Sequence, residues 1–158
     1  MNRSKIFDCI TFFDNNFMFE IRYNILSQYV DYFVICESKF DHRGNKKEKN
    51  FIWKENFDKK KIKYLLIDSP FPTNTNIWEN QAIQREELLN FINFAGQEDY
   101  IFFSDPDEIV RPELLENSEC AKVLNFKEIS FGVKILLKCH PPSLNNWIFF
   151  SLSNLKKL

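Results

Sequence analysis

The sequence predicts an α/β fold in which helices cover both faces of a mainly parallel sheet. Short apolar runs rich in β-forming residues alternate along the chain with segments of helical periodicity. Several of these runs are continuously apolar, as expected of strands that are buried on both faces. Strands joined by helices pair in parallel through right-handed crossovers, and this places helices on each side of the sheet.

Size and composition limit the classes of protein that fit. The chain has 158 residues, 44% hydrophobic and 27% charged, so we expect one globular domain over residues 1–158. The net charge of -1 gives no overall field that would attract DNA or RNA, and we expect no nucleic-acid partner. With three glycines and two histidines, the chain offers neither a glycine-rich phosphate loop nor a histidine-rich metal site.

The first half of the chain predicts strands and a helix in alternation. Ile6 to Phe13 is a β-rich apolar run that ends at turn and cap residues, and Phe17 to Tyr29 follows with helical spacing. Asp31 to Cys36 is typical of a buried strand. After it we expect a basic, solvated loop over 38–50, a short helix from Phe51 to Phe57 and a strand from Ile62 to Ile67. The helix stripe expected to face the sheet is Met18, Ile21, Ile25, Leu26 and Tyr29.

The second half continues the pattern. Residues 68–76 are rich in Pro, Thr and Asn and predict a loop. A helix is expected from Trp78 to Phe94, closed by Gly96, and a buried strand from Asp99 to Ser104. A further helix from Glu113 to Leu124 and a last strand from Ile129 to Leu137 complete the prediction. The apolar residues expected on one face of the long helix are Trp78, Ala82, Leu88, Leu89 and Ile92.

An acidic cluster follows the strand at 99–104. In open parallel sheets, ligands bind beyond the carboxyl ends of the strands. Asp105 and Asp107 would share one face of an extended segment, and Pro106 restricts Asp105 to extended backbone. Carboxylate oxygens select Mg²⁺ or Mn²⁺, which complete their shells with water and a substrate diphosphate. An equally weighted alternative is a polar turn in which Asp107 or Glu108 only favours the start of the next helix.

The cysteine pattern and the lengths of the apolar runs indicate the cellular compartment in which we expect the protein. The four cysteines form no Cys-x-x-Cys pair, and no apolar run approaches the ~18 residues of a membrane span. We therefore expect reduced thiols, no transmembrane segment and a cytoplasmic protein. Peripheral contact with the inner face of a membrane is kept as a secondary alternative.

Five segments, in this order, resemble glycosyltransferase family 17. Its best-known members are the β-1,4-mannosyl-glycoprotein β-1,4-N-acetylglucosaminyltransferases, which add bisecting N-acetylglucosamine. The resemblance spans residues 5–115. The segments are Lys5 to Phe13, the Glu20-Ile21-Arg22 helix, Val30 to Glu37, the helix from Trp78 to Arg85, and Asp105 to Ile109.

The resemblance implies a GT-A fold, which is Rossmann-like, and a UDP-sugar donor. It implies Mn²⁺ or Mg²⁺ held by Asp105 and Asp107, where the metal would act as a Lewis acid on the departing diphosphate. The implied reaction is inverting transfer of a sugar, N-acetylglucosamine being expected, to a glycan or lipid-linked sugar acceptor. Glu108 is near enough in sequence to touch the donor sugar, but the resemblance places the catalytic base later in the chain, so no base is assigned.

Three further residues are candidates for contact with the nucleotide-sugar. Glu37 ends a buried strand, where GT-A folds place an acidic residue for the ribose or base; the alternative is an exposed loop carboxylate. Arg85 could pair with the diphosphate or with a glutamate of its own helix. Phe13 could stack on uracil, although core packing is the more common role of phenylalanine. Arg22 is expected to form a structural ion pair with Glu20.

The resemblance weakens towards the end of the chain. From about Lys127 onward no clear match is found, and family catalytic domains normally extend further. We expect a C-terminally truncated or inactive copy that lacks the acceptor part, or a compact variant completed by a partner. Two other functions stay open: a metal-dependent phosphohydrolase, with Asp14 and Asp68 as further ligands, and a non-catalytic interaction domain.

Overall fold

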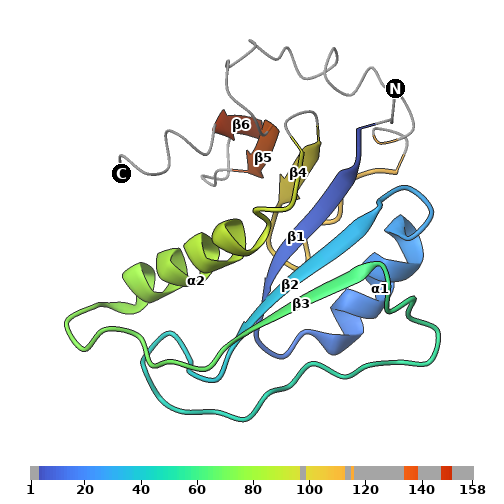
Figure 1. The fold of residues 1–158 in the computed structure, drawn as a ribbon. Helices are drawn as coiled ribbons and strands as arrows, with labels where there is room; N and C mark the ends of the chain where they lie inside the picture. Colours follow the sequence, from blue (N-terminus) through green and yellow to red (C-terminus); the bar gives the residue numbers. More distant parts are fainter. Residues whose placement is uncertain (1–3, 97–98, 113–114, 116–133, 139–146, 151–158) are drawn as a thin grey trace.

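A six-stranded sheet is the frame of the molecule (Figure 1). The structure is a computed structural model that describes residues 4–96, 99–112, 115, 134–138 and 147–150. Its elements in chain order are β1 (Ile6–Phe12), α1 (Asn16–Leu26), β2 (Tyr32–Ser38), β3 (Ile62–Ile67), α2 (Ile77–Phe91), β4 (Tyr100–Phe103), β5 (Lys134–Lys138) and β6 (Trp147–Phe150).

The strand order is β3-β2-β1-β4-β5-β6. Neighbouring strands from β3 to β5 pair in parallel, and β6 is antiparallel to β5. The mainly parallel sheet of the sequence prediction is therefore confirmed, and its order is that of a Rossmann-like fold. The order reverses between β1 and β4, which makes the carboxyl ends of these two strands the expected ligand crevice.

One face of the sheet packs against α1. Even-numbered β1 residues such as Ile10 and Phe12, and odd-numbered β2 residues such as Phe33, join Phe19 and Leu26 in a single apolar cluster. The predicted helix stripe is wrong in part, because Ile25 is exposed. The buried residues of α1 are Phe19, Arg22, Tyr23 and Leu26. The helix is rotated so that a charged side chain, Arg22, faces the sheet.

The other face packs against α2. Phe7 and Cys9 of β1 and Val34 of β2 form a second cluster with Leu88 and Ile92. Helices therefore cover both faces of the sheet, as predicted, and Figure 1 shows α1 and α2 on opposite sides of it. Within this cluster the thiols of Cys9 and Cys36 are free and buried, whereas the expectation for Cys120 and Cys139 concerns residues outside the described part of the chain.

Polar residues on α2 are buried where apolar ones were expected. Trp78 is 77% exposed, although the sequence placed it with Ala82 on the buried face. Gln84 is buried instead, and its amide donates to the Cys36 carbonyl of β2 at 2.8 Å. Asn80 is also buried and donates to the His42 carbonyl at 2.9 Å. Gln84 thus joins the helix to β2 itself, and Asn80 joins it to the chain that follows β2.

The segment between β2 and β3 is irregular. The helix predicted from Phe51 to Phe57 is wrong, since no helix occurs in these residues. Phe51 and Phe57 are buried in the α1 cluster, and the Asp58 amide donates to the Tyr23 hydroxyl at 2.8 Å. Contacts with distant elements therefore fix this backbone.

The predictions for the end of the chain are tested only in part. The helix predicted from Glu113 to Leu124 falls outside the described residues except at Leu115. The strand predicted from Ile129 to Leu137 overlaps β5 over residues 134–137.

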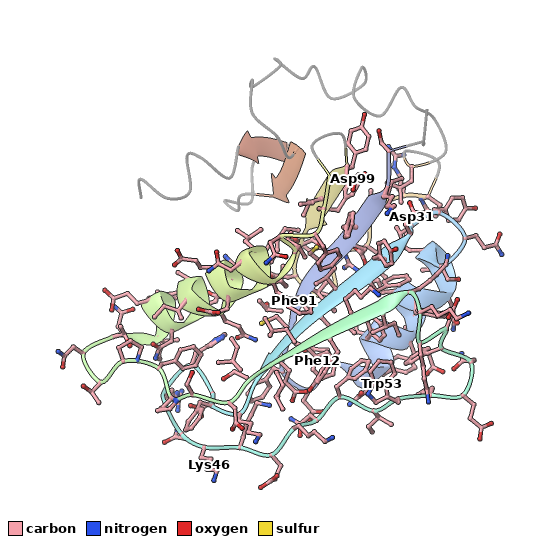
Figure 2. All side chains as sticks on the ribbon, in the orientation of Figure 1. Phe12, Asp31, Lys46, Trp53, Phe91 and Asp99 are labelled. Atoms are coloured by element: carbon pink, nitrogen blue, oxygen red, sulfur yellow. The ribbon has the colours of Figure 1, made fainter. Side chains whose placement is uncertain are left out.

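Two aspartates fix the amino edge of the sheet. Asp31 accepts a hydrogen bond from the Ile6 amide at 2.9 Å, and Asp99 accepts from the Lys5 amide at 2.8 Å. Both carboxylates thus hold the start of β1. Figure 2 shows Asp31 and Asp99 together at this end of the sheet and Phe12 towards the other end of β1. The opposite, carboxyl edge is where open parallel sheets bind ligands.

Helix α2 begins with a capping box. The Asn76 side chain accepts from the amides of Trp78 at 2.9 Å and Glu79 at 3.1 Å, and the Glu79 carboxylate accepts from the Asn76 amide at 2.7 Å. These bonds satisfy amides that have no partner within a helix.

Replacing the capping side chain should destabilise the protein. We expect Asn76→Ala to lower the free energy of unfolding by about 1 kcal/mol, and Asn76→Asp to restore most of it because an acceptor oxygen is retained. Urea denaturation at pH 7 measures both. Asn74→Ala, in the loop before the helix, is the matched control and should change the value by less than about 0.5 kcal/mol. Equal losses for Asn74→Ala and Asn76→Ala would contradict the cap.

Candidate functional site

The acidic cluster lies at the switch point between β1 and β4. The Ser104 amide donates to the Cys9 carbonyl at 3.2 Å, so the chain leaves β4 directly beside β1. It then turns tightly, with the Glu108 amide donating to the Asp105 carbonyl at 2.9 Å. The extended backbone expected for Asp105 to Asp107 is therefore wrong. Proline is favoured at the second position of such a turn, where its fixed φ fits, so Pro106 sets a turn here. We call residues 104–108 the acidic turn.

A buried arginine holds the acidic turn from the α1 face. Arg22 and Asp8 are each 1% exposed, and Arg22 donates to the Asp8 carboxylate at 2.6 Å and 2.5 Å. The same guanidinium donates to three backbone carbonyls of the turn and to a hydroxyl. These acceptors are the carbonyls of Asp105 at 3.1 Å, Pro106 at 3.4 Å and Glu108 at 3.0 Å, and the Ser104 hydroxyl at 2.7 Å.

The ion pair differs from the one that the sequence suggested. Arg22 pairs with Asp8 rather than with Glu20, and Glu20 contacts Lys54 at 2.5 Å near the surface. Burial would lower the pKa of Arg22, but the charge and hydrogen bonds of Asp8 outweigh burial and raise the pKa above its ordinary value. Asp8 was missed, although a lone carboxylate inside an apolar strand is a signal that a buried partner exists.

Arg85 of α2 approaches the acidic turn from the other face. Its Nη2 lies 3.2 Å from Asp105 Oδ1, and the guanidinium stacks over the Phe103 ring at 5.6 Å. The two side chains are 40% and 49% exposed, so this pair is accessible from solvent. Arg85 Nε is buried and has no hydrogen-bond partner in the described part of the chain. A half-exposed guanidinium beside Asp105 of the acidic turn is suited to an anionic ligand.

The acidic turn offers hard oxygen ligands. Asp107 is exposed, Asp105 is half-buried, and the Glu108 carboxylate lies 3.4 Å from the Asp105 amide. This donor set fits Mg²⁺ or Mn²⁺, which need few protein carboxylates when a substrate supplies phosphate oxygens. Within the described residues, no group of three or more His, Cys, Asp and Glu could hold a metal ion alone. The metal contacts of Asp105 and Asp107 stay a prediction.

Glu37 is fully buried, so the alternative of an exposed loop carboxylate is wrong. Four protein groups donate to it: Lys47 Nζ at 2.8 Å, the amides of Asn50 at 2.6 Å and Phe51 at 3.1 Å, and the Tyr64 hydroxyl at 2.7 Å. A carboxylate has about four lone-pair sites, so these donors fill it. Contact with a ribose would require one of them to be displaced, and that contact stays a prediction.

The hydrogen bonds to Glu37 set its protonation. Burial would raise the pKa of Glu37, but the bonds from Lys47, the two backbone amides and Tyr64 together hold the pKa below its ordinary value. The same contact acts on the partner, because burial and the nearby carboxylate raise the pKa of the Tyr64 hydroxyl. Glu37 therefore stays ionised and ties the basic loop to β2 and β3.

Phe13 lies at the surface directly after β1. Its side chain is 53% exposed, so the expectation that it packs in the core is wrong. Lys47 Nζ lies 5.2 Å from the ring centroid, and the Phe13 carbonyl accepts from the Asn50 side chain at 2.8 Å. The ring is fixed at the carboxyl edge and has a face open to solvent. Stacking on a nucleobase stays a prediction.

Two other features of this edge bear on alternatives. A pocket of about 370 Å³ is lined by His42, Arg43, Thr75, Asn76, Ile77 and Trp78.

Asp68 follows β3, three strand spacings or about 14 Å from β4, and it pairs with Lys39 at 2.8 Å. Asp68 is therefore too far away to share one ion with the acidic turn.

The fold and the site together define a Rossmann-like α/β protein with an acidic turn and a cationic partner at its ligand edge. The chain belongs to a family of enzymes that transfer sugars, since the family model of glycosyltransferase family 17 matches residues 1–127. No curated protein and no solved structure matches the chain. No helix in the described residues is long and apolar enough to cross a membrane.

Breaking the buried ion pair should be costly. We expect Asp8→Asn and Arg22→Met each to lower the free energy of unfolding by about 3 to 5 kcal/mol, because each leaves buried polar groups without a partner. Urea denaturation measures the loss. Glu20→Gln, which breaks the half-exposed pair with Lys54, is the control and should cost less than about 1 kcal/mol. A loss below 1 kcal/mol for Arg22→Met would show that the pair does not hold the turn.

The lowered pKa of Glu37 predicts a pH dependence of stability. A carboxylate whose pKa falls on folding stabilises the fold above its unfolded pKa, and this contribution is lost as pH drops through the folded pKa. We expect Glu37→Gln to cost about 2 kcal/mol at pH 7. The difference from wild type should shrink as pH falls below the ordinary value of 4.5. Urea titrations at pH 7, 5 and 3 measure it, with Glu55→Gln in the same loop as control. A difference that is constant with pH would contradict the assignment.

Proposed function

We propose that this protein transfers a sugar, with N-acetylglucosamine as the favoured one, from a UDP-sugar to a glycan or lipid-linked sugar acceptor. Mn²⁺ or Mg²⁺ at the acidic turn is part of the proposal. Family membership supports sugar transfer, and the position of the turn at the switch point of the sheet supports the donor site. We further propose that the protein works in the cytoplasm.

The observation that carries the proposed donor site is the half-exposed pair of Arg85 and Asp105 at the switch point of the sheet. The pair lies at 3.2 Å, and Arg85 Nε is buried without an acceptor in the described residues. The Arg85 side chain is 40% exposed, so a phosphate oxygen could accept from the terminal nitrogens of its guanidinium. Arg85 would therefore bind the diphosphate while Asp105 and Asp107 face the metal.

The residues in and around the turn would have separate roles in binding the donor. Asp105 and Asp107 would hold the metal, which supplies Lewis-acid stabilisation of the leaving diphosphate when bound. Arg22 fixes the backbone of the turn, so that its carboxylates need not be ordered when the donor binds. The Phe13 ring would stack on the base. Glu108 is itself the last residue of the turn, and the catalytic base is left unassigned.

The phosphohydrolase alternative has less support. It needs carboxylates from several strands around one metal cluster, and Asp68 lies about 14 Å away along the edge of the sheet. Asp14 is nearer because it follows β1. An ion shared between the turn and a substrate diphosphate requires fewer protein ligands and fits the described residues better.

Calorimetric titration with UDP tests the donor site. We expect Mn²⁺ to tighten UDP binding at least tenfold in the wild type, because the metal bridges the diphosphate and the turn. Asp105→Asn and Asp107→Asn should abolish this metal effect, and Asp68→Asn, an aspartate at the same edge but away from the turn, should retain it. UDP binding that is independent of metal, or that neither variant alters, would refute the proposed site.

A further inference from the structure

Four large apolar side chains are exposed near the carboxyl end of β1, at the start of α1 and along the loop between β2 and β3. They are Phe13, Phe17, Ile52 and Trp53, with exposed fractions of 53%, 73%, 58% and 42%. We call these four residues the apolar rim. Exposing this much apolar surface is unfavourable in water, so a group of such side chains indicates a binding surface.

Hydrogen bonds between the two segments hold the rim together. The Asn16 side chain accepts from the Ile52 amide at 2.9 Å and donates to the Asn50 carbonyl at 2.8 Å. The Asn50 side chain in turn donates to the Phe13 carbonyl at 2.8 Å. Two segments that lie far apart in sequence are therefore held side by side. The apolar side chains project from backbone that these hydrogen bonds keep in place.

The loop that carries half of the rim is strongly basic. Residues 39–61 contain nine Lys and Arg against four Asp and Glu, a net charge of +5 in a chain whose total is -1. Lys46 and Lys49 of this loop are exposed. Figure 2 shows Lys46 and Trp53 along the side of the molecule that lies away from Asp31 and Asp99. A loop of this length without helix or strand is uncommon in a compact domain and is usually functional.

We propose that the apolar rim and the lysines of the basic loop dock the protein onto the surface of an anionic lipid bilayer. The rim side chains of Phe17, Ile52 and Trp53 would insert at the boundary between headgroups and acyl chains, with Phe13 left to the nucleobase, and clustered lysines are attracted to anionic headgroups. Lysine is depleted in interfaces between proteins, so charge complementarity favours the bilayer over a protein partner. The long lysine side chains can also pack along the acyl region with their charges at the headgroups.

Docking by the rim would also determine which way the acidic turn faces. Phe13 follows β1 and the acidic turn follows β4, and these neighbouring parallel strands end at the same edge. A protein docked by the rim would turn its site towards the bilayer. If the proposed function holds, this orientation selects the lipid-linked sugar among the acceptors. Docking itself does not depend on sugar transfer and is measured without substrate.

Co-sedimentation with vesicles tests the proposal. We expect the wild type to bind phosphatidylcholine vesicles that contain about 30% phosphatidylserine, to bind pure phosphatidylcholine vesicles at least tenfold more weakly, and to be released from the anionic vesicles by high salt. Lys46→Glu/Lys49→Glu should weaken binding to anionic vesicles about tenfold or more. Phe17→Ser/Ile52→Ser should also weaken it while leaving the remaining binding dependent on salt.

Matched controls separate the rim from nonspecific effects. Lys5→Glu reverses a charge at the amino edge of the sheet, and Ile25→Ser removes an exposed isoleucine from the far end of α1; both should bind vesicles as the wild type does. Thermal unfolding confirms that each variant is folded. Absence of wild-type binding to anionic vesicles, or equal losses in the control variants, would overturn the proposal. A dimer that the rim variants dissociate, without vesicle binding, would overturn it in favour of contact between two copies.

Discussion

The buried pair of Asp8 and Arg22 is the interaction on which the site depends. It lies between the central strand and α1, in a region that is otherwise apolar. Two charges in such a place are tolerated only when they are paired and fully hydrogen-bonded, and Arg22 meets this condition by also binding the carbonyls of the acidic turn. The same contacts that satisfy the arginine therefore place the aspartates. Loss of the pair would affect the core and the site together.

The carboxyl edge uses buried polar groups to position exposed ones. Glu37 is buried and accepts from the amides of Asn50 and Phe51, which fixes the loop backbone next to the exposed Ile52 and Trp53. Asn80 likewise holds the chain that leaves β2 through the His42 carbonyl. The exposed residues of the edge owe their positions to these contacts, since loops alone would leave them with many conformations.

The sequence predicted β1 to β4, part of β5 and the place of the acidic turn, because apolar runs and the edge rule depend on local composition and on general topology, but it did not predict β6. It predicted the buried helix faces only in part, since Leu26, Leu88 and Ile92 are buried as expected whereas Ile25 and Trp78 are exposed. Arg22 and Gln84 face the sheet since their partners, Asp8 and the Cys36 carbonyl, lie elsewhere in the chain. Pro106 was consistent with two geometries, extended backbone and a turn. The contacts of Arg22 with the turn join residues far apart in the chain, so the sequence alone does not show them.

The large separation in sequence between Arg22 and the acidic turn also limits when the site can form during folding. Asp8 and Arg22 are 14 residues apart and can meet within the first strand and helix, whereas the carbonyls of the turn are more than 80 residues further on. Until β4 docks beside β1, the guanidinium has donors that only water can satisfy. The acidic turn therefore becomes ordered in the same event that completes the central sheet, and the first strand and helix alone cannot hold a ligand at it.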